Sequence, residues 1–148
     1  MNYIDNEKYK KMKSPKIDGG FSFQFEKDFD KDEIEKLLDL KCKSFALKKD
    51  TKINPITNEK APGFIRFAFK EQENADCGSF VKVIVDYLYG FKTEINSLCE
   101  KYDGKLNIYQ NIYLTSLKHP YIQLDRETIK KMGELNIMLD TSIDFLEY

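Results

Sequence analysis

The sequence predicts an α+β domain in which a mostly antiparallel sheet is covered on one face by about three helices. Four segments alternate apolar and polar side chains, as half-buried strands do, and three others repeat apolar residues every three or four positions, as helices do. The strands are expected at 21–26, 64–69, 105–115 and 137–145, and the helices at 30–40, 78–102 and 125–135. The expected order is therefore strand, helix, strand, helix, strand, helix, strand. Helices would pack on the apolar side of the sheet, leaving its polar side to solvent or a partner.

Length and composition favour one soluble domain. The chain has 148 residues, enough to bury a core without disulfides. We expect a polar N-terminal arm at 1–16, followed by a single α+β domain at 17–148. The 24 basic and 25 acidic residues leave a net charge of −1, which does not indicate a general nucleic-acid binder. The 11 phenylalanines and 9 tyrosines, without tryptophan, predict an aromatic-rich core.

The first strand and helix have clear local signals. Alternating phenylalanines at 21–25 would face the core, and the two glycines at 19–20 would form a turn before the strand. The acidic segment 28–33 begins like a calcium-binding loop, but Glu33 and Asp39 occupy the positions that require glycine and a bidentate glutamate. Asp30 instead fits as the N-cap of a helix, with Glu33 at the capping-box position.

The later elements are less regular. The long polar stretch 41–63 is expected to be a functional or mobile loop, or to contain a short strand near 44–47. Gly90 interrupts the expected helix at 78–102 and would mark close packing. In the last helix Asp125 fits as the N-cap, and Ile129 repeats the position that Ile34 has relative to Asp30, which predicts Ile129 on the buried face.

No catalytic or cofactor motif is found. Cys42, Cys77 and Cys99 are odd in number and lack a C-x-x-C pair, which predicts reduced thiols in a cytoplasmic protein. The single histidine, His119, precedes a proline and is expected to be an exposed turn residue. The chain shows no signal peptide and no apolar run long enough for a membrane span, so we expect no metal, cofactor, nucleic acid or membrane as a ligand.

Two surfaces are candidates for binding a protein partner. One is the acidic first turn of the helix at 30–40, and the other is the polar face of the sheet, where exposed tyrosines and carboxylates are expected together. The candidate partner-binding residues are Asp28, Asp30, Asp32 and Glu33 in the acidic turn, and Glu26, Tyr109, Tyr113, Asp140 and Asp144 on the sheet face, beside Gln24, Arg66 and Ser142.

Two sequence motifs resemble those of a family of small bacterial domains of unknown function. They are FSFQF followed by DKDEIEKLLDLK at 21–25 and 30–41, and LDRETIKKMGELNIMLDTSI at 124–143. The resemblance carries no enzymatic activity. Some members of that family lie beside toxin genes, in the manner of immunity proteins, so the resemblance implies a non-enzymatic binding protein that neutralises a toxin domain encoded by a neighbouring gene.

Two other functions remain open at this point. The chain could be a small-ligand-binding or enzymatic domain with a pocket at the loop 41–63, because loops of that length often carry binding sites. It could also be a structural domain that forms homodimers through the edge of a strand.

Overall fold

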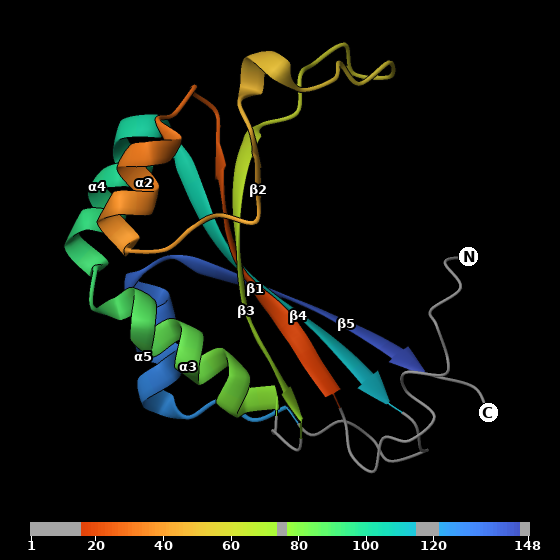
Figure 1. Ribbon diagram of the computed structural model, residues 1–148, viewed down its shortest axis with the longest axis vertical. Coiled ribbons are helices and arrows are strands. Elements are labelled where there is room, and N and C mark those ends of the chain that lie inside the picture. The colour runs from red at the N-terminus through yellow and green to blue at the C-terminus, as the bar shows by residue number, and fades with distance from the viewer. Residues whose placement is uncertain (1–15, 74–76, 115–121, 146–148) are drawn as a thin grey trace.

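A computed structural model describes residues 16–73, 77–114 and 122–145 of the chain, which form one five-stranded sheet and four α-helices. In chain order the elements are β1 (Lys16–Phe25), α2 (Lys31–Leu38), β2 (Ser44–Ala46), the 3-10 turn η1 (Lys48–Asp50), β3 (Gly63–Glu73), α3 (Cys77–Tyr89), α4 (Lys92–Tyr102), β4 (Gly104–Leu114), α5 (Arg126–Glu134) and β5 (Ile137–Phe145). All four helices lie on the same side of the sheet (Figure 1). The predicted α+β class is confirmed, and the short strand expected near 44–47 is β2. None of the described helices is long and apolar enough to span a membrane.

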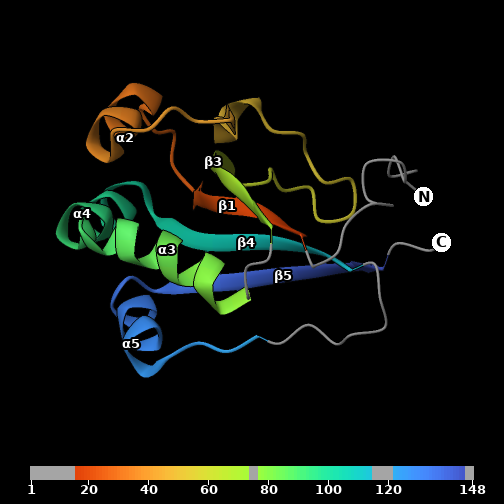
Figure 2. The same ribbon diagram turned by 60° about the horizontal axis from the view of Figure 1, so that its bottom comes forward.

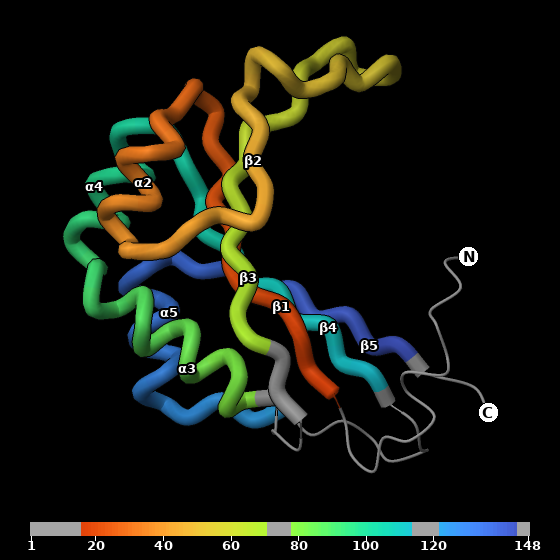
Figure 3. Tube along the Cα trace, in the orientation of Figure 1, coloured from red at the N-terminus to blue at the C-terminus, as the bar shows by residue number. Residues whose placement is uncertain are grey.

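The sheet is mixed, with the strand order β2-β3-β1-β4-β5. Three of its four pairings are antiparallel, and only β4 and β5 run parallel (Figures 2 and 3). A parallel neighbour needs a crossover connection, which here contains α5. On the helix side this pair is joined by Gln110, whose Nε2 donates a hydrogen bond to Thr141 Oγ1 at 3.0 Å.

The single helix predicted at 78–102 is wrong, because the chain forms two helices there. After α3 ends, Phe91 N donates to Leu88 O at 2.9 Å, and Phe91 then becomes the N-cap residue of α4. The apolar period continues across this break because both helices cover the same sheet. Gly90 is exposed, and a Cβ there would meet only Tyr87 O at 3.4 Å, so the close packing predicted at this glycine is also wrong.

The predicted turn at 19–20 is wrong as well, since both glycines lie inside the central strand β1. Lys16, the last residue of the predicted N-terminal arm, begins that strand, and the rest of the arm lies outside the described residues. Gly19 has φ +149, and a Cβ on it would lie 2.1 Å from Tyr109 O of β4. A Cβ on Gly20 would lie 1.9 Å from Phe67 O of β3. The backbones of the two neighbouring strands therefore come too close to β1 to allow a side chain.

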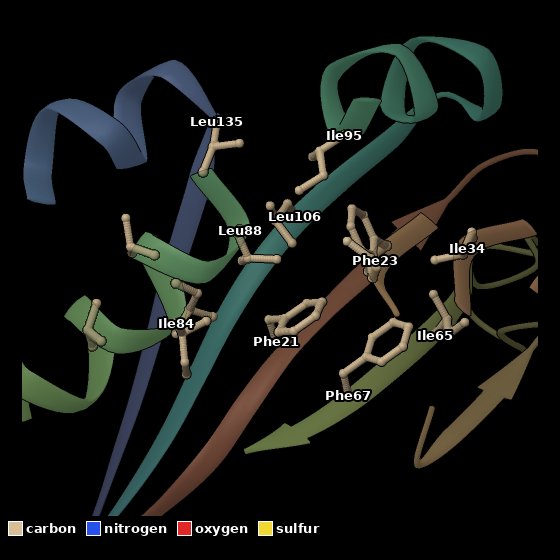
Figure 4. Packing of buried hydrophobic residues seen from close by; sticks show 14 of the residues in the cluster. Phe21, Phe23, Ile34, Ile65, Phe67, Ile84, Leu88, Ile95, Leu106 and Leu135 are labelled. Carbon is tan, nitrogen blue, oxygen red and sulfur yellow. The ribbon is translucent and has the colours of Figure 1, made fainter. Parts of the chain in front are cut away.

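An aromatic-rich core lies between the sheet and the helices (Figure 4). Phe21 and Phe67 stack with ring centroids 4.9 Å apart, and Phe23 stacks on Phe25 at 5.6 Å. The helices contribute completely buried aliphatic side chains, among them Ile34, Ile84, Leu88 and Ile95. Each such side chain contributes about 1.5–3 kcal/mol to folding.

Both predicted aspartate N-caps are confirmed. Asp30 accepts hydrogen bonds from the amides of the first turn of α2, and Asp125 Oδ1 accepts one from Thr128 N at 2.7 Å. The buried face of α5 differs from the prediction, however. Ile129 is 55% exposed, whereas its neighbour Thr128 is 1% exposed. Helices α2 and α5 therefore share an aspartate N-cap. They differ at the residue four positions later, which is buried in α2 (Ile34) and exposed in α5 (Ile129).

We expect Gly20→Ala to destabilise the protein by about 3 kcal/mol or more, because its methyl group would overlap a backbone carbonyl of β3 that cannot rotate away. Gly133→Ala in α5 is the matched control, since a Cβ there meets nothing within 4 Å. That change should stabilise the protein by at most about 1 kcal/mol through helix propensity. Urea denaturation of the two variants measures the difference, and equal midpoints would show that β1 can move away from its neighbours.

Candidate functional site

Opposite the helices lies the second face of the sheet, which we call the open face (Figure 1). It carries the polar side chains of the alternating strands. Because the phenylalanines of β1 and the apolar residues of β4 point into the core, the residues between them point the other way. The open face comprises Lys16, Asp18, Ser22 and Gln24 of β1, Phe64 and Arg66 of β3, Lys105, Asn107, Tyr109, Asn111 and Tyr113 of β4, and Met138, Asp140, Ser142 and Asp144 of β5.

The parallel register of β4 and β5 arranges the predicted sheet-face residues in pairs. Tyr109 is the direct neighbour of Asp140, and Tyr113 is the direct neighbour of Asp144. Neither aspartate forms an ion pair with another described residue. These two tyrosines and two aspartates are therefore neighbours along β4 and β5, and we call the four residues the Tyr-Asp patch.

A chain of hydrogen bonds between side chains fixes the middle of the open face. Asn111 Nδ2 donates to Asp18 Oδ1 at 2.8 Å, and Ser142 Oγ donates to Asn111 Oδ1 at 2.7 Å. The chain crosses three strands, from β1 through β4 to β5. It holds β5 and its two carboxylates in register with the centre of the sheet, so the Tyr-Asp patch has a fixed position before any partner binds.

Tyr109 lies flat on the sheet instead of extending into solvent. Its hydroxyl donates to Phe67 O at 3.4 Å, which requires the side chain to cross β1 at Gly20, the residue that pairs with Tyr109. Burial raises the pKa of the phenol above its usual value, although the nearby Arg66 guanidinium opposes this effect. The hydroxyl therefore remains a hydrogen-bond donor at neutral pH, and the ring offers an immobilised apolar surface.

The charges of the open face are separated. The guanidinium of Arg66, on β3, lies over the ring of Phe64 with 4.9 Å between its central carbon and the ring centroid. The two carboxylates of the Tyr-Asp patch lie on β5, at the opposite edge. A binding partner would accordingly meet Arg66 on β3, Lys105 at one end of β4 and the two carboxylates on β5.

The residues of the acidic turn lie apart from the Tyr-Asp patch, and most of them contact other parts of the protein. Asp30 caps α2, accepting from Asp32 N at 3.0 Å and from Glu33 N at 3.4 Å. Glu33 accepts from Tyr102 at 2.7 Å and pairs with Lys101 at 3.1 Å, and these two contacts lower the pKa of its carboxyl group. The reciprocal bond expected of Glu33 in a capping box is replaced by this link to α4.

Glu26 and Asp28 hold the start of the loop that follows β2. Glu26, which follows the last residue of β1, pairs through Oε2 with Lys48 Nζ at 2.8 Å. Asp28 Oδ1 accepts from Lys49 N at 3.2 Å. The side chain of Asp32 is 91% exposed, and its Oδ1 lies 3.7 Å from Lys31 Nζ.

One surface depression touches the start of the stretch 41–63, where a ligand pocket was the alternative prediction. An open depression of about 450 Å³ beside α2 shares only Lys41 with that stretch. Its most buried carboxylate, Glu35, is 5% exposed, pairs with Lys31 Nζ at 2.7 Å and accepts from Cys42 N at 2.8 Å. The bond with Lys31 and then the Cys42 amide lower the pKa of Glu35, so it is an ionised structural group that joins α2 to the following chain.

Burial affects two of the three cysteine thiols. Burial raises the pKa of the Cys99 thiol to about 11 and also raises that of Cys42, so both stay protonated at neutral pH. His119 lies outside the described residues. Within the described ranges, no three His, Cys, Asp or Glu side chains gather in a way that could hold a metal ion.

Fold and site together define an α+β domain whose sheet has one face covered by helices and one polar face that no described helix covers. The chain belongs to the family described as "Domain of unknown function (DUF4279)", whose model matches residues 20–146. No curated protein and no solved structure is significantly similar to it.

The role of Glu35 can be tested by pH. Its pKa in the folded protein is depressed below the ordinary value of 4.5, so its stabilisation should be complete above that pH and be lost as the pH falls through the folded value. Glu35→Gln should therefore lower the urea midpoint at pH 7, and the difference from the unmodified protein should shrink below about pH 4.5. An unchanged midpoint at pH 7 would show that Glu35 is free to bind a ligand.

Proposed function

We propose that this protein is a non-enzymatic binding domain that recognises another protein through its open sheet face. The observation that carries the proposal is the Tyr-Asp patch, where the register of β4 and β5 places two tyrosines beside two carboxylates that lack ion pairs with the described residues. In its more specific form, the proposal is that the chain acts in the cytoplasm as an immunity protein and neutralises a toxin domain encoded by a neighbouring gene. The family resemblance of its two motifs supports this form.

The chemistry of the open face suits a protein partner. Tyrosines bury a large surface on binding at low entropic cost, and they are enriched among the residues that dominate binding energy. Tyr109 is already immobilised on the sheet, and the Asp18–Asn111–Ser142 chain fixes the neighbouring strand. A preformed surface of this kind avoids the cost of ordering side chains when the partner binds.

The charges indicate what kind of surface the partner would present. Asp140 and Asp144 are four residues apart in β5 and therefore lie on the same face of the strand. They would attract a basic surface such as that of a nuclease. An inhibitor of this kind needs no catalytic group, because it works by covering the active cleft of its target.

The same carboxylates weaken the homodimer alternative. Within the described residues, β5 is the outermost strand at its edge of the sheet, and two copies could in principle pair there. An antiparallel pairing centred on Ser142 would place Asp140 of one copy opposite Asp144 of the other. Like charges directly opposite each other destabilise a strand pair, so this edge favours a partner of opposite charge.

We expect the double change Asp140→Lys and Asp144→Lys to weaken binding of the toxin domain encoded by the neighbouring gene by about 100-fold, because it replaces attraction by repulsion. The dissociation constant would be measured by calorimetry with the purified domain. The same change should abolish protection in cells that produce the toxin.

The matched control is the double change Glu94→Lys and Glu127→Lys, which alters the net charge equally. These residues are exposed on α4 and α5, on the helix side. This variant should bind within about threefold of the unmodified protein, because long-range charge alone contributes little at physiological salt. Equal weakening by both double changes would contradict a role for the open face, and the absence of any complex would contradict the immunity proposal.

A further inference from the structure

Residues 47–62, which we call the projecting loop, extend from the β2–β3 edge of the sheet and point away from the helices (Figures 1 and 2). The loop includes η1 and ends where β3 begins. Its tip exposes two large apolar side chains, Ile53 at 55% and Ile56 at 91%. Among the large hydrophobic residues described as exposed, Ile56 is the most accessible.

The base of the projecting loop is fixed to the body of the protein. Lys48 pairs with Glu26, and the amide of Lys49 bonds to Asp28, as described above. Across the loop, Thr51 Oγ1 donates to Ala61 O at 2.7 Å. The two ends of the loop are therefore held together where the chain leaves and rejoins the sheet.

The tip of the loop is also ordered by its own hydrogen bonds. Ile53 forms a bridge with Lys60, and Asn54 N donates to Glu59 O at 2.8 Å. Asn54 Oδ1 in turn accepts from Ile56 N at 2.9 Å. Asn54 O accepts from Asn58 N at 2.8 Å, while Asn58 adopts a left-handed conformation with φ 59. The exposed isoleucines are thus presented by a closed turn whose shape is set before binding.

The charges beside the tip are mainly positive. Four lysines lie in the loop against one aspartate and one glutamate. Lys52 precedes Ile53 and has no ion pair with a described residue, and Lys60 Nζ donates only to Lys49 O, a neutral carbonyl. A pocket that receives the tip would gain from acidic groups at its rim.

We propose that the projecting loop is a second docking element, which inserts Ile56 and Ile53 into an apolar pocket with an acidic rim on the partner protein. The proposal rests on the proposed function, because it takes the partner to be the protein bound by the open face. A protein pocket fits this tip better than a lipid bilayer does. The tip exposes two isoleucines, and the same turn carries Glu59 and two asparagines, which hydrocarbon would exclude.

The test measures binding of the toxin domain encoded by the neighbouring gene to full-length variants. Ile56→Asp should weaken binding about thirtyfold, because a charge would be forced into the apolar pocket. Ile56→Leu should stay within about threefold, because it keeps the apolar volume. Val83→Asp is the matched control, since Val83 is 48% exposed on α3 and should leave binding unchanged. Because Ile56 contributes no burial to the core, the urea midpoint of Ile56→Asp should also stay unchanged.

The outcomes separate this proposal from the proposed function. If Ile56→Asp binds normally while the Asp140→Lys and Asp144→Lys variant does not, the docking role of the loop is overturned and the open face stands. If neither the unmodified protein nor any variant binds the toxin domain, both proposals are contradicted. The unmodified chain could also sediment with phosphatidylcholine–phosphatidylglycerol vesicles. If it does and Ile56→Asp does not, the loop binds lipid and the proposal of a protein pocket is overturned. A homodimer that Ile56→Asp dissociates would also overturn it.

Discussion

The close approach of three backbones at Gly19 and Gly20 is the constraint on which the rest of the structure depends. β1 is the central strand, and it pairs with β3 on one side and β4 on the other. Because neither glycine has a side chain, the strands can meet there at distances that a Cβ would forbid. On the core side this brings the phenylalanines of β1 and β3 into stacking contact. On the open face it leaves a gap in the row of side chains, which the ring of Tyr109 crosses to reach β3. One local feature of the backbone therefore shapes both the core and the candidate binding surface.

Local chemistry was enough to predict most of the elements from the sequence, but it could not predict how they meet. The alternation in the strands and the caps Asp30 and Asp125 depend on residues close in sequence, and the structure confirms them. The break at Phe91 is invisible to periodicity, since an apolar pattern continues unchanged when two helices lie on one sheet. Two consecutive glycines usually indicate a turn, which is why the sequence suggested one at 19–20. The reason that β1 needs glycine there is the close approach of β3 and β4, which are distant in sequence. Similarly, Thr128 replaces Ile129 on the buried face of α5 because tertiary packing decides how that helix is rotated.

The candidate site was predicted only in part, for the same reason. Alternation placed Tyr109 and Asp140 on one polar face, but their neighbouring positions depend on a parallel register that no local pattern reveals. The Asp18–Asn111–Ser142 chain was missed because its members come from three strands far apart in sequence. A count of acidic residues was also a poor guide to available charge. Glu26 and Glu33 form surface ion pairs with Lys48 and Lys101, so part of the negative charge expected to meet a partner is already balanced within the chain.

The acidic turn and the projecting loop are linked, and this link bears on how recognition would work. Glu26 and Asp28 follow β1 directly, and they hold Lys48 and Lys49 at the base of the loop. The loop is thereby fixed to the same central strand over which Tyr109 lies. A tip on a flexible tether would have to be ordered on binding, whereas a tip attached to β1 is already positioned relative to the open face. Two elements of opposite charge, the acidic Tyr-Asp patch and the basic tip, would then select a partner with two matching surfaces at a set separation. Such a requirement restricts the range of partners more than either surface does alone, which is the property an inhibitor of a single target needs.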